Sequence, residues 1–351
     1  MKRLKVGMVG IGRATSYGNI FAQNVRAEVT ALCDINEENL AISGRDFGLK
    51  DSQLFSNYDS FINTDVDIVV IGTPIPYHAE QAVKALERDK HVLCEVTAAD
   101  NIEGCEKIVK AAKRSKGKYM LAENCVYMHF AMEWKKFVEQ GRLGKIHYAE
   151  ADYVHDIREL VIDKWRAKRA PIHYCSHSLG PILYWMDDYI VRATASGNKA
   201  TIIENVGPGA IDMQVALFET KKGSTIKVLR SSVAPRHPMM GAYSIYGTKG
   251  FLETGRTNYD NIGIRYFEGI DTVNGRNITV SSSEIDVPKV AHLGGHGTSE
   301  YYLVSDFLDA IENDRTPPID YIKGMDMTVP GLIANEAAMQ GSVWLDVPRL
   351  I

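Results

Sequence analysis

The sequence lacks a surplus of charge of either sign and has no long apolar run. Its 40 Lys and Arg residues nearly balance its 44 Asp and Glu residues, which leaves a formal net charge of −4. Nucleic-acid-binding proteins usually carry a basic patch or stripe, so we expect no nucleic acid partner. The longest stretch without a charged side chain, Ala170–Met186, has 17 residues and contains Pro171, Pro181 and two histidines. A segment of this length and polarity does not span a bilayer, so we expect no membrane association.

Cysteine is also scarce. The five cysteines are odd in number, widely scattered and without the paired spacing of a metal site. The N-terminus passes from Met1 directly into a strand-like run at Leu4–Val9, without an apolar leader and cleavage site. These features predict a cytoplasmic protein whose thiols stay reduced.

The length of 351 residues predicts two domains of roughly 100–200 residues each. In the first, residues 1–125, short apolar runs alternate with segments of helical periodicity such as Ala79–Leu86 and Ile102–Ala112. This alternation predicts an α/β fold of the Rossmann type, with a doubly wound parallel sheet covered by helices. The predicted strands are Leu4–Val9, Val29–Cys33, Ile68–Ile71, His91–Cys94 and Tyr119–Ala122.

The second domain, residues 126–351, has a different pattern. After a helical segment at Met132–Gln140, strand-like runs follow one another through short turns such as Lys221-Lys222-Gly223. Strands joined in this way pair antiparallel, so we expect an α+β domain on an open, mostly antiparallel sheet. The predicted strands are Ile146–Tyr153, Ile211–Glu219, Thr225–Val233, Ala242–Tyr246 and Ile262–Phe267, and helices are predicted at Tyr301–Glu312 and Met325–Met339.

A glycine pair follows the first predicted strand at once. Gly10 and Gly12 occupy the first two positions of a G-x-G-x-x-G motif, and Arg13 and Ala14 begin the helix that follows. Such a turn brings the backbone and a helix N-terminus close to a pyrophosphate. Thr15 stands where the third glycine is usual, so we expect the packing of helix on strand to be looser or shifted.

An acidic residue supports this dinucleotide site. Asp34 ends the second predicted strand, 22 residues after Gly12, where a carboxylate can accept hydrogen bonds from the adenosine ribose. The next residues, Ile35 and Asn36, offer no cation for a 2′-phosphate. We therefore expect NAD as the cofactor rather than NADP. The alternative is an α/β protein in which Asp34 has only a structural role.

Further motifs resemble the glucose–fructose oxidoreductase / inositol dehydrogenase (Gfo/Idh/MocA) family. They are Gly72–His78, Lys90–Glu95, Tyr246–Gly250 and Ser305–Ile311. The resemblance covers nearly the whole chain and implies hydride transfer to or from a sugar-like hydroxyl. It implies further cofactor-binding residues at Thr73, Pro74, His78, Glu95 and Asn124.

The chain departs from this family at two positions. Family members usually carry Glu-Lys-Pro where this chain has Glu95-Val96-Thr97, so the lysine near the nicotinamide is replaced. They also often carry Asp four residues before a catalytic His, where this chain has His173 before His177.

Both departures resemble an offshoot of the family, the NAD-dependent α-N-acetylgalactosaminidases and related redox-neutral glycosidases. The matching segments are Glu123-Asn124, Tyr153–Asp156, Tyr174–Pro181 and His296-Gly297. In that class a hydroxyl is oxidised, the acidified neighbouring proton is removed, the glycosidic substituent is eliminated, water adds and the ketone is reduced again. The predicted catalytic residues are His177, Tyr174, His155 and Glu123, and the predicted substrate-binding residues are Tyr153, His173, Arg166 and His296.

Each of these residues also has a structural interpretation. His177 could cap or pack a helix, Tyr174 could be an interface aromatic, His155 could pair with Asp156, and His173 could lie at a rim. Zinc ligation by the His173-x-Cys175-x-His177 spacing offers only three ligands where structural sites use four, so we expect no metal.

Three functions remain open from the sequence. The first is an NAD-dependent oxidoreductase acting on a sugar, glycoside or polyol; the second is a redox-neutral glycosidase or lyase. The third is a non-catalytic regulatory protein that binds NAD or a sugar. The alternating run Ile211–Leu217 offers an apolar sheet face, so we also expect a homo-oligomer, a dimer or tetramer.

Overall fold

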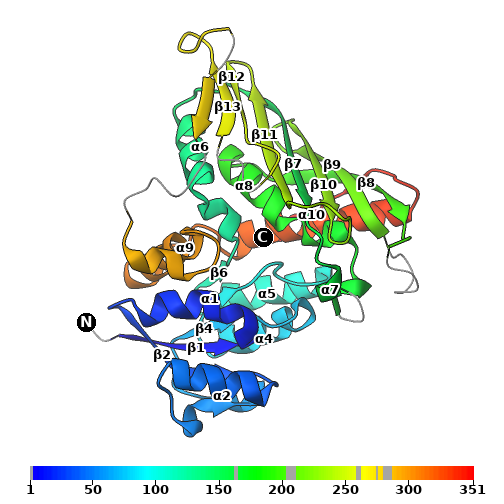
Figure 1. The fold of residues 1–351 in the computed structure, drawn as a ribbon. Coiled ribbons are helices and arrows are strands. Elements are labelled where there is room, and N and C mark those ends of the chain that lie inside the picture. Colours follow the sequence, from blue (N-terminus) through cyan, green and yellow to red (C-terminus); the bar gives the residue numbers. More distant parts are fainter. Residues whose placement is uncertain (1–2, 162–164, 203–210, 258–261, 274–275, 280–286) are drawn as a thin grey trace. The chain divides into compact units, whose positions relative to one another are not determined.

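The computed structural model describes residues 3–161, 165–202, 211–257, 262–273, 276–279 and 287–351 (Figure 1). The chain divides into two compact units. The first consists of Met1–Tyr127, Asp286–Met325 and Leu350–Ile351, and the second of Met128–Ile285 and Asp326–Arg349.

The first unit is built on a six-stranded parallel sheet in the order β3-β2-β1-β4-β5-β6. This strand order is that of a doubly wound dinucleotide-binding fold and confirms the predicted class. The strands are β1 (Leu4–Val9), β2 (Ala27–Cys33), β3 (Leu54–Phe55), β4 (Ile68–Ile71), β5 (His91–Cys94) and β6 (Tyr119–Leu121). The helices are α1 (Ile11–Ala22), α2 (Glu37–Asp46), α3 (Tyr58–Phe61), α4 (His78–Leu86), α5 (Ile102–Arg114) and α9 (Ser299–Glu312).

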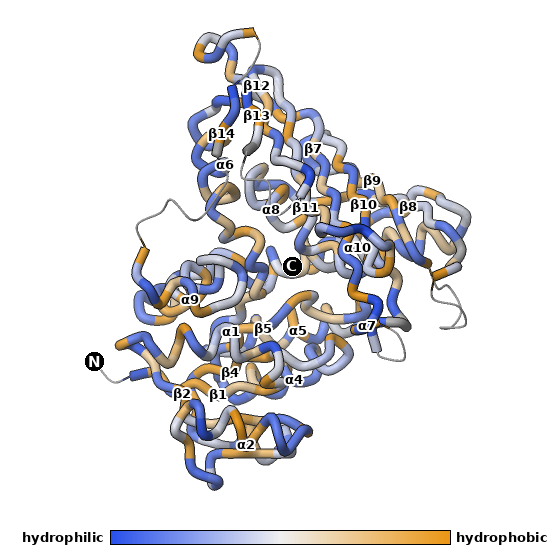
Figure 2. Tube along the Cα trace, viewed as in Figure 1, coloured by the Kyte–Doolittle hydropathy of each residue, from blue (hydrophilic) through white to orange (hydrophobic). Residues whose placement is uncertain are grey.

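The central strands of this sheet are apolar because helices cover them. All four residues of β4, Ile-Val-Val-Ile, are fully buried, and hydrophobic stretches mark β1 and β4 in Figure 2. Strands buried on both faces carry apolar residues at every position rather than at alternate ones. Continuous apolar runs therefore identified these strands in the sequence.

Helix α9 belongs to the first unit, although the sequence analysis placed residues 126–351 together in the second domain. It packs against α1, and Arg26 forms an ion pair with Asp309 on α9. Lys118 likewise bonds Asp314 just beyond α9, with 2.8 Å between Nζ and Oδ1. These contacts join residues that are 283 and 196 positions apart in the sequence, which no local pattern indicates.

The second unit contains a nine-stranded sheet in the order β14-β13-β12-β11-β7-β10-β9-β8-β15. The pair β7 and β10 is parallel and the other pairs are antiparallel, as the prediction of a mostly antiparallel sheet requires. The strands are β7 (Ile146–Val154), β8 (Ile190–Lys199), β9 (Ile211–Thr220), β10 (Thr225–Ser231), β11 (Met240–Gly247), β12 (Gly250–Glu253), β13 (Ile262–Phe267), β14 (Arg276–Thr279) and β15 (Leu345–Asp346).

Helices cover one face of this sheet. Helix α8 packs against β7, and α6 packs in turn against α8. An aromatic cluster of Phe130, Trp134, Trp185 and Tyr243 joins α6, α8 and β11, with ring centroids 4.9–6.3 Å apart. The helices with residues in this unit are α6 (His129–Glu139), α7 (Arg158–Val161), α8 (Ser176–Met186) and α10 (Tyr321–Met339), whose first residues belong to the first unit.

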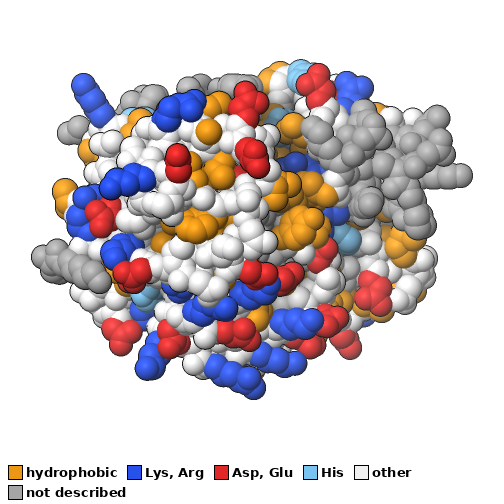
Figure 3. All heavy atoms as spheres, turned by 90° about the horizontal axis from the view of Figure 1, so that it is seen from below, with side chains coloured by type: hydrophobic (Ala, Val, Ile, Leu, Met, Phe, Trp, Pro, Cys, Tyr) orange, Lys and Arg blue, Asp and Glu red, His pale blue; other side chains and the backbone are white. Residues whose placement is uncertain are grey.

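The surface agrees with the balanced composition. On the face shown in Figure 3, Lys and Arg side chains are interspersed with Asp and Glu side chains. Within the described part of the chain, no helix has both the length and the apolar character needed to cross a membrane.

Candidate functional site

The candidate residues of the first unit follow the carboxyl ends of its parallel strands. Gly10, Asp34, Thr73, Glu95 and Glu123 each come within two residues of the end of β1, β2, β4, β5 and β6 respectively. Ligands of open α/β sheets bind at this edge. One edge of one sheet therefore collects residues that are spread over more than 110 positions of the sequence.

The glycine loop has the form that a pyrophosphate needs. Gly10 has φ +74°, and a Cβ there would lie 2.4 Å from the Thr73 backbone nitrogen, so no other residue fits. A Cβ at Gly12, by contrast, would meet no atom within 4 Å. The first turn of α1 therefore leaves open space beside Gly12, where a pyrophosphate could approach the helix N-terminus.

The third glycine role is shifted along α1, as the sequence analysis expected. Thr15 donates its hydroxyl to the Ile11 carbonyl, 2.6 Å away, within the helix itself. The close packing of helix on strand falls instead on Gly18, where a Cβ would lie 2.4 Å from Met8 Sδ on β1. The close packing that the third glycine usually provides is therefore present, although Thr15 occupies that position of the motif and Gly18 provides the packing.

The Asp34 carboxylate is fixed at the end of β2. Its Oδ2 accepts a hydrogen bond from the Ile11 backbone N–H at 2.8 Å, and its Oδ1 accepts from the Asn36 N–H at 2.9 Å. These bonds hold a half-buried carboxylate beside the first turn of α1. This position suits hydrogen bonds to the ribose hydroxyls of a dinucleotide.

Glu95 joins a buried network that the sequence did not reveal. Its carboxylate pairs with Arg13, with 2.7 Å between Nε and Oε1, and its other oxygen accepts from the Val96 N–H at 3.1 Å. Burial, with the negative charge of Glu95, raises the pKa of the Tyr17 hydroxyl well above its usual range. Val96, which stands where the family has lysine, is itself buried, so an apolar group replaces that cation.

His78 is held by backbone carbonyls. Its Nδ1 lies 2.8 Å from the Thr97 carbonyl oxygen and its Nε2 lies 2.7 Å from the Thr73 carbonyl oxygen. The ring is 1% exposed, so it ties the loop that contains Pro74 to the segment after β5. His78 was predicted to bind the cofactor, and this geometry gives it the task of positioning the loop.

Asn124 and His296 come together around a residue that was not predicted from the sequence, Glu300. The Asn124 amide donates to Glu300 Oε1 at 3.5 Å, and His296 Nδ1 lies 2.5 Å from the same oxygen. Burial acts to raise the pKa of the Glu300 carboxyl, but the hydrogen bond and charge of His296 hold that pKa below its usual value. Glu123, fully buried beside Asn124, accepts from the Cys125 N–H at 3.2 Å.

In the second unit the structure brings together four predicted residues. His177 lies in the first turn of α8, and its ring is 5.0 Å from that of Tyr174 and 5.8 Å from that of Tyr153. His155 follows directly after β7, with its ring 6.1 Å from that of Tyr153. The Tyr243 hydroxyl donates to the His177 carbonyl at 2.5 Å, which fixes the start of the helix.

Arg230 completes this group and was not predicted. It is paired in register with Tyr153 across β10 and β7, and its guanidinium lies 4.2 Å from the Tyr153 ring centroid and 5.4 Å from that of Tyr174. The sequence does carry a signal for it. Ile226, Val228 and Arg230 alternate onto the buried face of β10, so a charged residue stands at a core position.

His155 does not use its neighbour Asp156 as a structural partner. The Asp156 carboxylate accepts from Arg158 at 2.8 and 2.7 Å and lies 3.2 Å from His237 Nε2. Burial, together with the charge of Arg230, lowers the pKa of the His155 ring below its usual value. A neutral imidazole beside the Tyr153 phenol can accept a proton, which suits a general base.

His173 and Arg166 lie in the segment before α8. Arg166 is exposed and stacks on Trp165, 4.5 Å from the ring centroid. Burial and the charge of Arg169 lower the pKa of His173 to about 3. His173 therefore stays neutral near physiological pH and can donate or accept a hydrogen bond without changing charge.

This shift predicts a pH dependence of stability. The pKa of His173 is lower in the folded protein than in the unfolded chain. As the pH falls from about 6.5 toward 3, the unfolded chain therefore binds a proton that the folded protein does not bind. The free energy of unfolding falls over that pH range. We expect His173→Gln to lose less stability than the wild type between about pH 7.5 and about pH 4.5, measured by urea unfolding. An equal loss in both proteins would contradict the assignment.

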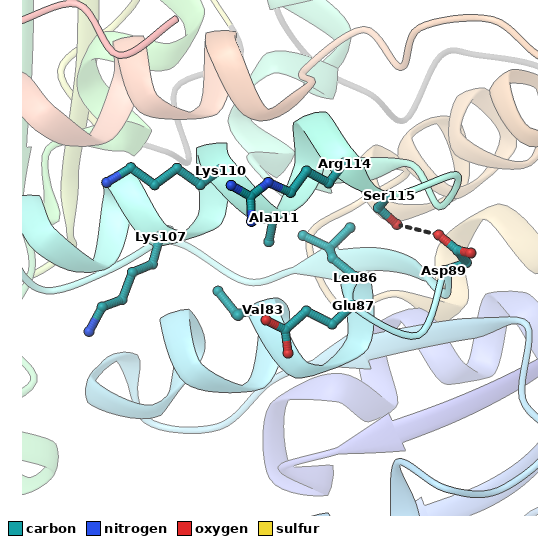
Figure 4. Close-up of a pocket in the computed structure, with 9 residues that line it drawn as sticks. All are labelled: Val83, Leu86, Glu87, Asp89, Lys107, Lys110, Ala111, Arg114 and Ser115. Carbon is teal, nitrogen blue, oxygen red and sulfur yellow. Dashed lines mark hydrogen bonds between the residues drawn. The ribbon is translucent and has the colours of Figure 1, made fainter.

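A separate surface pocket lies between α4 and α5 (Figure 4). It is lined by Val83, Leu86, Glu87, Asp89, Lys107, Lys110, Ala111, Arg114 and Ser115. These residues stand at the helix ends that lead into β5 and β6, at the edge of the sheet opposite the glycine loop. We assign it no part in the chemistry.

Comparisons with known proteins agree with this arrangement. Residues 4–123 match the Gfo/Idh/MocA model described as "Oxidoreductase family, NAD-binding Rossmann fold", and residues 135–347 match "Oxidoreductase family, C-terminal alpha/beta domain". A protein of Phocaeicola vulgatus named "Glycosyl hydrolase family 109 protein 2" is 28% identical over 71% of this chain and 70% of its own. The "Alpha-N-acetylgalactosaminidase" of Bacteroides fragilis is 28% identical over 71% of this chain and 68% of its own.

The fold has solved counterparts. The structure of a levoglucosan dehydrogenase in complex with NADH and L-sorbose superposes with a TM-score of 0.85 at 21% identity, covering 99% of this chain and 100% of that one. Both family models together span most of the sequence, and the glycine loop and Asp34 have the geometry that NAD requires. The chain therefore belongs to the Gfo/Idh/MocA family of NAD-binding oxidoreductases.

Proposed function

We propose that the protein oxidises a hydroxyl group of a sugar or glycoside. The observation that carries the proposal is the cluster of His155, Tyr153, Tyr174 and His177 in the second unit, which provides proton acceptors. Oxidising an alcohol removes a hydride from carbon and a proton from oxygen, so a positioned base is required. Curated relatives named for glycoside hydrolysis support a carbohydrate substrate.

The cofactor fits the first unit. The start of α1 at Gly12 would hold the pyrophosphate and Asp34 the ribose, while Thr73, Pro74, Glu95 and Asn124 line the same edge of the sheet. When bound there, NAD supplies the hydride acceptor. His177 takes the hydroxyl proton in this proposal, because an imidazole exchanges protons near neutral pH.

A second candidate is a redox-neutral glycosidase. The buried Val96 in place of the family lysine and the two glycosidase-named relatives favour it. After oxidation, one base of the cluster would remove the proton next to the new carbonyl, the leaving group would depart, water would add, and the carbonyl would be reduced again. The sugar is then released without net oxidation.

A panel of sugars, polyols and glycosides tests both candidates. We expect at least one compound to give either stoichiometric NADH or free aglycone without NADH. The second outcome requires deuterium from solvent at the carbon next to the oxidised position, because the base exchanges its proton with water. Neither NADH nor aglycone from any member of the panel would contradict the proposal.

We also propose that the protein forms a homo-oligomer through the face of the second sheet opposite α8. Rings of Tyr148, Tyr246, Phe251 and Tyr266 follow one another on this face at 5.9–6.4 Å, and Leu217 is 39% exposed on β9. Light scattering at micromolar concentration is expected to give a dimer or tetramer of the 39.0 kDa chain. A monomeric mass would contradict this assembly, and Leu217→Asp is expected to weaken it.

The setting that we propose is the cytoplasm. All five cysteines are free and buried in the structure. Scattered buried thiols without disulfide partners are typical of proteins in a reducing compartment.

A further inference from the structure

Arg230 is a buried cation without a counter-ion among the described residues. Its side chain is 1% exposed, and its Nε and Nη1 have no hydrogen-bond partner in the described structure. A guanidinium does not lose its proton in a protein, so the charge cannot be removed by titration. Burying an uncompensated charge is costly, and such a charge is retained where it acts on something.

Among the described residues, three carboxylates on or directly after β7 and on β9 have other partners. Asp152 pairs with Lys227 and Asp156 with Arg158, and Asp212 accepts from the Thr201 backbone. On the neighbouring strand β9, Gln214 is the register partner of Arg230. Its uncharged amide is already bonded to Ile172 and Asn335.

The groups that face Arg230 are therefore phenols and an imidazole. Tyr153 on β7 and Tyr174 before α8 present their rings to the guanidinium, and His155 follows directly after β7. A nearby positive charge favours the ionised form of a phenol and the neutral form of an imidazole. The titratable groups that interact electrostatically with Arg230 are Tyr153, His155, Tyr174, Cys175 and Tyr243.

We propose that Arg230 is a positioning residue that holds Tyr153 and Tyr174 and stabilises the phenolate form of one of them, which relays the proton that His177 takes from the substrate. This inference rests on the proposed function for its use, but its test does not depend on that function. The phenolate accepts the proton from His177, becomes a phenol and passes that proton to water, so the step needs no oxidant or other reagent.

The direct test is an ultraviolet titration of tyrosine ionisation in the substrate-free protein. In the wild type, a fraction of the tyrosine absorbance change is expected to occur at a lower pH than that of the remaining tyrosines. Arg230→Met is expected to move that fraction upward by about 1–3 pH units, and Arg230→Lys to restore most of the difference. Tyr153→Phe and Tyr174→Phe are each expected to reduce the shifted fraction.

A matched control is available on β13. Arg265 also lies over aromatic rings, 5.1 Å from Phe267 and 5.7 Å from Phe137, but no phenol is stacked against it. Arg265→Met is expected to leave the tyrosine titration unchanged. An Arg230→Met titration identical to that of the wild type would overturn the proposal. If Arg230→Met does not fold, the same comparison is made between Arg230→Lys and Arg230→Gln.

The second readout is the pH profile of kcat/KM. Because a base must be unprotonated to act, the acid limb of the profile is expected to move to higher pH in Arg230→Met by the same amount as the titration. A purely structural role would lower activity at every pH without moving the limb. The titration needs no substrate, so failure of the proposed function leaves the titration result intact, and the reverse is also true.

Discussion

Replacing His177 with alanine is expected to lower kcat/KM by about 10²–10⁴-fold, the usual contribution of a positioned general acid or base. The imidazole ring lies 5.0 Å from the Tyr174 ring, and His177 is 7% exposed. The backbone carbonyl of His177 accepts a hydrogen bond from the Tyr243 hydroxyl. That bond uses the backbone, so it survives the substitution. We therefore expect the loss in activity to come with a small loss in stability, measured as a thermal unfolding midpoint.

The control for His177 is another histidine of the same unit. His147 lies on β7 and is exposed, with no place in the cluster. His147→Ala is expected to retain wild-type kcat/KM. If His177→Ala retained full turnover, His177 would not take part in proton transfer and the cluster would not be the catalytic centre.

Replacing Gly10 with alanine is expected to destabilise the first unit strongly. The left-handed backbone alone costs a side chain about 1–3 kcal/mol, and here the new Cβ would also lie 2.4 Å from a backbone nitrogen of Thr73. A backbone atom cannot rotate away as a flexible side chain can. We expect a lower urea midpoint of unfolding and, with it, loss of NAD binding.

Gly12→Ala is expected to weaken cofactor binding without changing the stability of the fold. A Cβ at Gly12 meets no atom of the protein within 4 Å, so the free protein is expected to keep its stability. The same methyl group would occupy the space proposed for the pyrophosphate, and NAD affinity is expected to fall by about tenfold or more. Unchanged affinity in a stable Gly12→Ala protein would place the cofactor elsewhere.

Features that depend on local sequence were predictable. Five of the six strands of the first unit contain short apolar runs, and the glycine turn and Asp34 follow strand ends that such runs define. The proton-transfer cluster was also named in part, because Tyr174 and His177 stand three residues apart and meet across the start of one helix.

Features that depend on long-range packing were not predictable. Glu300 reaches Asn124 only because α9 folds back onto the first unit, and Arg230 reaches Tyr153 only through the register of two strands 70 residues apart. Strands β3, β8, β12, β14 and β15 were missed because they are short or carry polar residues at successive positions. In each case the pairing partner, rather than the segment's own composition, creates the structure.

The most direct measurement of the central claim is a single turnover with protein, NAD and substrate in equal amounts, followed by the absorbance of reduced nicotinamide. The account predicts a rise in this absorbance. The rise persists if the oxidised sugar is the product, and it falls again as the aglycone appears if the enzyme is redox-neutral. Product formation at full yield without any rise, at a time resolution faster than turnover, would contradict oxidation of a hydroxyl as the first step.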